Sequence, residues 1–196
     1  MLSFRRMETN PKLILASGSP RRAELLRSSG IDFEVRRPEA DEIPRAGEVP
    51  AEFTERTARE KAASIQLNAD EIILAADTIV TIAGTILGKP ADENHAGEML
   101  RLLAGNIHEV ITGVCLRAAG KVVSFSVSTA VEFRKLADDE IVAYIKTGEP
   151  LDKAGAYAIQ GGAAGMVRKI NGSYSNVVGL PLCEVIEAVN GLTSES

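Results

Sequence analysis

Residues 13–26 read LILASGSPRRAELL, and this stretch restricts the fold of the chain more than any other. It begins as an apolar strand, passes through a short polar loop and continues as a helix with Pro20 at the first helical position. Arg21 and Arg22 fall in the first helical turn, where the aligned peptide dipoles already make the backbone electropositive. Each arginine therefore costs about 0.3–1 kcal/mol of helix stability. Two cations in this place need an explanation outside the helix itself.

Further strand and helix patterns follow along the chain. Strands are predicted over 12–16, 31–35 and 72–82, with a turn at Ala83–Gly84, and a long hairpin over 109–133 turns at Ala119–Gly120. Helices are predicted over 20–29, 50–67, 92–103 and 138–147, and a last short helix begins at Pro181. The stretch 151–181 is glycine-rich. Strands and helices mix without strict alternation, which favours a single α/β domain around an elongated mixed sheet over 11–196, after a flexible tail over 1–10.

The composition limits the partners that the chain can have. Its 196 residues carry a net charge of −5, whereas binding to DNA or RNA normally requires a basic face. Tryptophan is absent and the aromatics are only five Phe and three Tyr, so no platform for stacking bases is visible. No apolar run is long enough to span a membrane, and the first ten residues lack the apolar core of a secretory signal. We therefore expect a cytoplasmic protein that binds neither a nucleic acid polymer nor a membrane, although a small anion remains a possible ligand.

The cysteines and histidines offer little chemistry. Cys115 and Cys183 lie far apart in apolar runs, and both are predicted to be buried, reduced thiols. His95 and His108 are equally isolated. A zinc site or a Ser/His/Asp triad therefore has few residues to draw on.

The segment 17–23, SGSPRRA, favours binding of an oxyanion. The hydroxyls of Ser17 and Ser19, the free N–H groups at the helix start and the guanidinium groups of Arg21 and Arg22 all suit phosphate oxygens, and together they predict a polyphosphate site. The alternative is that both arginines point outward into solvent. The segment is not a Walker A loop, because the pattern GxxxxGK[ST] is missing.

A carboxylate, Asp77, interrupts the apolar run IILAADTIV. Burying a lone charge costs several kcal/mol, so this group must be neutralised, paired or bound to a metal. A divalent ion that bridges Asp77 to phosphate oxygens would satisfy it, and Glu42 in the acidic stretch EADE is the candidate partner. The alternatives are an aspartate that merely closes the end of a strand and an acidic loop that is merely solvated.

Three further polar side chains lie in places where they can contact a ligand. Lys61 and Lys89 are ordinary when taken alone, but Lys89 follows the hairpin from Asp77 and can fold back beside it. Gln160 stands among glycines that allow close approach of the backbone. Because its amide both donates and accepts hydrogen bonds, Gln160 suits recognition of the edge of a flat polar ring.

Four motifs occur in the order ASGSPRR, ADTIV…LGKP, DKAGAYAIQG and NGSYSNVVGLP. With them, the sequence resembles the Maf family of nucleoside triphosphate pyrophosphatases from about Lys12 to Ala188. The resemblance implies an elongated α/β molecule with two lobes around a cleft, similar to inosine triphosphate pyrophosphatases, and a homodimer. It implies hydrolysis of a nucleoside triphosphate at the α–β phosphate bond to the monophosphate and pyrophosphate, with a divalent metal such as Mg²⁺, Mn²⁺ or Co²⁺.

The resemblance also implies a role for individual residues. Asp77 matches the catalytic proton acceptor, which orients or deprotonates the attacking water. Three residues match the positions tied to base selectivity in the dTTP/UTP branch: Arg21, Thr78 and Gln160. The polar cleft residues are matched by Ser17, Arg22, Glu42 (or its neighbour Asp41), Lys61 and Lys89.

Two other functions stay open at this stage. The family name reflects a link to septum formation, so the chain could be a nucleotide-sensing regulator with little turnover. It could also be a 7-methylguanosine triphosphate pyrophosphatase, but that branch tends to carry a different residue in place of Arg21 and lacks AYAIQG. A buried acid beside phosphate ligands favours catalysis, because a sensor needs no base. We therefore expect a pyrophosphatase for dTTP, UTP and related pyrimidine nucleotides.

Overall fold

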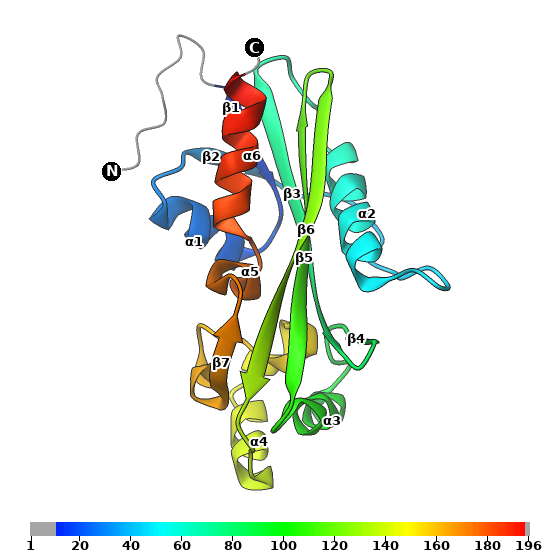
Figure 1. Ribbon diagram of the computed structural model, residues 1–196, viewed down its shortest axis with the longest axis vertical. Helices are drawn as coiled ribbons and strands as arrows, with labels where there is room; N and C mark the ends of the chain where they lie inside the picture. Colours follow the sequence, from blue (N-terminus) through cyan, green and yellow to red (C-terminus); the bar gives the residue numbers. More distant parts are fainter. Residues whose placement is uncertain (1–10, 195–196) are drawn as a thin grey trace. The chain divides into compact units, whose positions relative to one another are not determined.

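The computed structural model describes residues 11–194, which form a mixed seven-stranded sheet with flanking helices (Figure 1). The strands are β1 (Lys12–Ala16), β2 (Phe33–Arg36), β3 (Glu71–Ile82), β4 (Thr85–Leu87), β5 (Ile107–Ala118), β6 (Lys121–Phe133) and β7 (Val167–Asn171). Their order is β2-β1-β3-β5-β6-β7, and β4 pairs with β3 outside this path. β1 is parallel to β2 and β3, whereas β4 and β7 run antiparallel to their partners. The predicted α/β class with a mixed sheet is confirmed.

The helices are α1 (Pro20–Ser28), α2 (Pro50–Ala63), α3 (Glu93–Leu103), α4 (Asp138–Ile145), α5 (Tyr174–Val178) and α6 (Leu182–Ser194). All five predicted helices exist, although α2 ends four residues earlier than expected and α6 is longer than expected. The glycine-rich stretch contains three short 3₁₀ segments, η1 (Glu149–Asp152), η2 (Ala154–Ala156) and η3 (Gly162–Met166), followed by β7 and α5. These pieces have five residues or fewer, too few for a periodic pattern to show in the sequence.

The chain divides into two compact units that are each built from separate stretches of sequence. Unit 1 comprises Met1–Asp77, Thr112–Val127 and Gly179–Ser196, and unit 2 comprises Thr78–Ile111 and Ser128–Val178. The strands β3, β5 and β6 contribute one end to each unit. The single domain over 11–196 stays a prediction, and the predicted tail over 1–10 lies outside the described residues.

The core of unit 1 is formed where α2 packs on the sheet. In Figure 1 the strands of this unit run between α2 on one side and α1 and α6 on the other. Small residues of α2, Ala58 and Ala62, are fully buried in one cluster with Ile14 and Ile73 of the central strands. Gly113 of β5 makes the close approach possible, because a Cβ there would overlap with the backbone of α2 at Thr54.

The core of unit 2 is formed around α3, which packs against α4, η1 and η2. Asp92 caps the helix by accepting a hydrogen bond from the His95 N–H at 2.8 Å. Unit 2 also contains a buried trio of rings, His108, Phe133 and Tyr157, with edge-to-face contacts and centroid distances of 4.8–5.4 Å. This packing fixes Tyr157 and hence the segment that leads to Gln160.

The two cysteines differ in their surroundings. Cys115 is a buried free thiol, as predicted, and burial raises its pKa to about 11. Cys183 is exposed, so the prediction of a second buried thiol is wrong. The buried residues of α6 include Val185 and Leu192, seven positions apart on one face, and Cys183 is turned away from that face.

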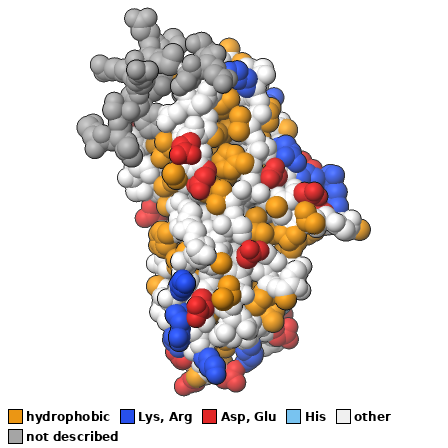
Figure 2. Space-filling model, viewed as in Figure 1, with side chains coloured by type: hydrophobic (Ala, Val, Ile, Leu, Met, Phe, Trp, Pro, Cys, Tyr) orange, Lys and Arg blue, Asp and Glu red, His pale blue; other side chains and the backbone are white. Residues whose placement is uncertain are grey.

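The surface and the helices of the described residues show two further features. On the face seen in Figure 2, acidic and basic side chains are interspersed with hydrophobic ones. Within residues 11–194, no helix has the length and apolar character needed to cross a membrane.

Candidate active site

The loop between β1 and α1 helps to hold one of the two arginines of α1 inward. Ser17 Oγ accepts hydrogen bonds from the Ser19 N–H at 3.1 Å and from Arg22 Nη1 at 3.2 Å. Arg22 Nε donates to the Gly179 carbonyl oxygen at 2.7 Å, and the side chain is buried. Arg21, by contrast, is half-buried. The alternative of two solvated arginines is therefore wrong for Arg22.

The Arg22 guanidinium belongs to a cluster of charges within unit 1. Burial lowers the pKa of Arg22 and the charge of Arg21 lowers it further, whereas the carboxylates of Asp77 and Glu42 raise it. An arginine stays protonated under all these influences. Unit 1 therefore brings the predicted phosphate ligand Arg22 into the field of both predicted acids.

Lys61 links these two acids. It lies in the last turn of α2, and its Nζ is 2.7 Å from Asp77 Oδ1 and 2.6 Å from Glu42 Oε1. The side chains of Lys61 and Asp77 are only 8% and 7% exposed, while that of Glu42 is 47% exposed. Asp77 lies inside β3 rather than at its end, so the alternative of a strand-closing aspartate is wrong. Its charge is matched by the lysine.

The same two carboxylates suit a divalent cation. Glu42 and Asp77 reach one common cationic atom, the Lys61 Nζ, so both can approach a single ion. No group of three or more His, Cys, Asp or Glu residues with metal-binding geometry occurs in the part of the chain that the structure describes. Mg²⁺ commonly binds through one or two carboxylates, with waters and substrate phosphates as its other ligands. The pair fits that mode of binding.

A residue that the sequence reasoning missed holds the loop that carries Glu42. Arg56 of α2 donates to the Ile43 carbonyl oxygen at 3.0 Å and to both carboxylate oxygens of Glu48, at 2.6 and 2.8 Å. It also binds Glu60 one turn later at 3.0 Å. The Arg56–Glu60 spacing of four residues was visible in the sequence, but the contact with Ile43 depends on the path of the loop.

The remaining predicted residues belong to unit 2. Thr78 follows Asp77 directly on β3 and is half-buried, whereas Lys89 and Gln160 are exposed. Because β4 runs antiparallel to β3, the chain that follows it turns back in the direction of Thr78 and carries Lys89. The Gly88 carbonyl oxygen accepts a hydrogen bond from the Gly155 N–H at 3.1 Å, which ties the Lys89 segment to the Gln160 segment.

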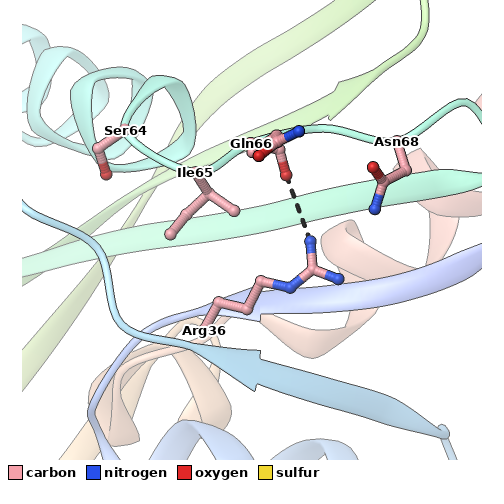
Figure 3. Close-up of a pocket in the computed structure, with 5 residues that line it drawn as sticks. All are labelled: Arg36, Ser64, Ile65, Gln66 and Asn68. Atoms are coloured by element: carbon pink, nitrogen blue, oxygen red, sulfur yellow. Dashed lines mark hydrogen bonds between the residues drawn. The ribbon is translucent and has the colours of Figure 1, made fainter.

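A hollow of about 320 Å³ in unit 1 is lined by Arg36, Ser64, Ile65, Gln66 and Asn68 (Figure 3). Arg36 Nη1 donates to the Gln66 carbonyl oxygen at 3.2 Å, the dashed contact in Figure 3. The guanidinium also binds both carboxylate oxygens of Glu71, at 2.9 and 2.5 Å, and holds the pKa of that acid down at about 2. The charge of Arg36 is thus already matched, so the hollow lacks the free cation that an anion site needs.

The protein combines an α/β fold, serines at the start of α1, arginines in the first turn of α1 and a buried acid–lysine pair. This combination is typical of a protein that binds phosphorylated substrates. More particularly, the chain belongs to the Maf family, because residues 12–192 match the family described as Maf-like protein. The resemblance drawn from the four motifs is confirmed.

The chain is similar to named relatives over nearly its whole length. It is 52% identical to the dTTP/UTP pyrophosphatase of Geobacter metallireducens, with 92% of this chain and 96% of that protein covered. It is 53% identical to the protein of the same name from Geobacter sulfurreducens, with 90% and 94% covered. A HAM1 protein structure from Coxiella burnetii aligns with a TM-score of 0.49 at 16% identity, covering 95% of this chain and 100% of that one.

Proposed function

We propose that the protein hydrolyses nucleoside triphosphates, with dTTP and UTP as preferred substrates, at the α–β phosphate bond. Membership of the Maf family and the names of relatives about half identical in sequence support this proposal. The observation that carries it is the buried Asp77 carboxylate, paired with Lys61 and close to the charge of Arg22. A general base and phosphate-binding cations are the two components that this hydrolysis needs.

The phosphate oxygens bind to arginine and lysine side chains and to the segment that carries Ser17 and Ser19. Arg22 is already ordered by Ser17 and Gly179, so little side-chain entropy is lost when an anion arrives. The Ser17 and Ser19 segment adds N–H groups at the start of α1. The full set proposed for phosphate binding is Ser17, Ser19, Arg21, Arg22, Lys61 and Lys89.

In the chemical step, Asp77 accepts a proton from the attacking water. The water oxygen forms a bond to the α-phosphorus, and the bond from this phosphorus to the bridging oxygen breaks. That oxygen leaves with the β- and γ-phosphates as pyrophosphate, and the nucleoside monophosphate remains. Removal of a general base typically lowers the rate by ~10²–10⁴-fold.

Asp77 and Glu42 would hold the divalent metal, Mg²⁺, Mn²⁺ or Co²⁺, for which their donor set is suited. When bound, the ion supplies positive charge that offsets the charge developing on the pyrophosphate. Lys61 already holds both carboxylates toward one point.

Recognition of the base is assigned to Gln160, Thr78 and Arg21. Thymine and uracil present a 4-oxo acceptor and an N3–H donor, and the Gln160 amide can donate to the first and accept from the second. Cytosine reverses both groups, so the same amide orientation would leave polar groups unpaired. Selectivity for dTTP and UTP over CTP follows.

The test is pyrophosphate release from a panel of nucleotides with Mg²⁺ or Mn²⁺, for the wild type and Asp77→Asn. We expect turnover of dTTP and UTP, and a loss of at least ~10²-fold in the variant with nucleotide binding retained. Nucleotide binding without turnover would show a sensor instead. A best rate on 7-methylguanosine triphosphate would assign the chain to the other branch.

We further propose that the enzyme works in the cytoplasm as a homodimer and binds neither a nucleic acid polymer nor a membrane. Sedimentation equilibrium of the full chain tests the dimer directly. A monomer at micromolar concentration would contradict it.

A further inference from the structure

The turn that carries Gln160 is held by hydrogen bonds on both of its sides within unit 2. Before it, the Ala158 N–H donates to Tyr144 Oη at 3.1 Å, and Tyr157 Oη pairs with His108 Nε2 at 2.8 Å. After it, the Gly162 N–H donates to Glu149 Oε2 at 2.9 Å. The Gln160 side chain itself is exposed. The backbone is thus fixed on either side of a side chain that faces solvent.

The Glu149 carboxylate occupies the space where a side chain at position 161 would lie. A Cβ added to Gly161 would overlap with Glu149 Oε1, and a Cβ added to Gly162 would lie 3.2 Å from Glu149 Oε2. Gly161 has a φ of −113°, a value open to any residue. The absence of a side chain at Gly161 leaves the space that the Glu149 carboxylate occupies.

Glu149 lies in a backbone segment that is held by hydrogen bonds. Glu149 is the first residue of η1 and follows Gly148, whose φ of +75° ends the turn after α4. Its own N–H donates to Thr147 Oγ1 at 3.2 Å, and Thr147 Oγ1 donates to the Tyr144 carbonyl oxygen at 2.6 Å. Since Tyr144 also binds Ala158, the two ends of the Gln160 turn are attached to the same short stretch, 144–149.

We propose that Glu149 is a positioning residue for base selectivity, which acts by fixing the turn of Gln160 and does not touch the substrate. The inference rests on the proposed function, in which Gln160 reads the pyrimidine edge. Two hydrogen bonds to a base edge discriminate only if the amide is held in one orientation. Without the Glu149 bond to Gly162, the turn loses one of the hydrogen bonds that fix it, and the amide distinguishes thymine and uracil from cytosine less well.

The experiment measures kcat/KM for dTTP and for CTP in the full-length protein and takes their ratio. Glu149→Ala is expected to lower this ratio about tenfold, the factor for one lost hydrogen bond, mainly through KM for dTTP. Glu149→Gln keeps an acceptor oxygen for the Gly162 N–H and should retain most of the ratio. Glu98→Ala, at an exposed carboxylate on α3 of the same unit, is the matched control and should change neither value.

A second variant approaches the contact from the other side. Gly161→Ala places a methyl group where the carboxylate lies and should lower the ratio as Glu149→Ala does. Gln160→Ala should also lower it, and adding Glu149→Ala to Gln160→Ala should lower it little further, because both act through one amide.

The outcomes distinguish a failure of the positioning role of Glu149 from a failure of base recognition by Gln160. A lowered ratio in Gln160→Ala with an unchanged ratio in Glu149→Ala and Gly161→Ala overturns the role of Glu149. An equal loss for dTTP and CTP, together with a lower Tm, would show that Glu149 is merely structural and would also overturn it. An unchanged ratio in Gln160→Ala shows instead that base reading by Gln160, and with it the proposed role of the turn, is wrong.

Discussion

Removing Lys61 should destabilise the protein more than removing its partner Asp77. Lys61→Met leaves the Asp77 carboxylate, 7% exposed, without the ammonium at 2.7 Å. Loss of one partner from a buried ion pair costs about 3–5 kcal/mol, and the attraction of Arg22 for the Asp77 charge favours the lower end of that range. Asp77→Asn is milder, because Lys61 keeps Glu42 at 2.6 Å and only one charged hydrogen bond of about 1.5–3 kcal/mol is lost.

Urea unfolding of the substrate-free protein at pH 7 measures the free energy of unfolding of each variant. In a chain of this size, about 3 kcal/mol corresponds to a fall in Tm of roughly 6–12 °C. The double variant Lys61→Met/Asp77→Asn leaves no unpaired charge at Asp77 and should be more stable than Lys61→Met alone. Equal losses for the two single variants, or a double variant no better than Lys61→Met, would refute the reasoning. Pyrophosphate release should be low in all three.

Three further perturbations follow from the contacts. Arg22→Ala should lower the free energy of unfolding by about 1–3 kcal/mol, because it removes the bonds to Gly179 and Ser17. Arg21→Ala should leave the free energy of unfolding unchanged or raise it by a few tenths of a kcal/mol. Thermal melts showing the reverse order would contradict this. Burial lowers the pKa of His108 from 6.5 to about 4, so protons bind the unfolded chain more readily. The free energy of unfolding should therefore fall as pH drops through 6.5 toward 4, by ~2 kcal/mol between pH 8 and 5. His108→Gln should reduce this pH dependence of the free energy of unfolding in urea titrations. An equal pH dependence in both proteins would assign the acid sensitivity to other groups. Gln160→Ala should lower kcat/KM for dTTP and UTP by an amount that corresponds to about 1–3 kcal/mol of lost transition-state stabilisation, and by less for CTP and GTP. A uniform loss would indicate that Gln160 contacts the phosphates, the sugar or water.

The elements that were predicted from the sequence carry a local signal: an apolar run, an alternation of apolar and polar residues, or a residue that starts or ends a helix. β3 is a largely apolar run, interrupted by Asp77, that is buried on both faces, and α3 combines an Asp92 cap with buried Leu100 and Leu103 on one face. β7 lacks such a pattern, because its five residues are half-buried or exposed and it exists by pairing with β6. Its formation depends on a partner strand more than thirty residues earlier in the chain, which no local pattern records.

Asp77, Arg21 and Arg22 stand out in the sequence because each breaks a local rule, but their partners do not. An aspartate in an apolar strand needs a partner for its charge, but no local sequence pattern indicates that this partner is Lys61 rather than a metal. That pairing arises because α2 packs on β3 and brings residues sixteen positions apart together.

The two arginines of α1 show most directly where local reasoning ends. Arg21 and Arg22 oppose the helix dipole equally, since both lie in the first turn and no acidic residue accompanies them. One turn of sequence cannot distinguish them. The fold does so, because α1 rotates Arg22 toward the Gly179 carbonyl and Ser17 and leaves Arg21 half-exposed. Arg22 therefore gains tertiary hydrogen bonds that act against its dipole cost. For Arg21, we propose that a bound anion offsets this cost. If both are phosphate ligands, adding pyrophosphate should raise the Tm of the wild type more than that of Arg21→Ala, and an equal rise in both proteins would exclude Arg21 from the site.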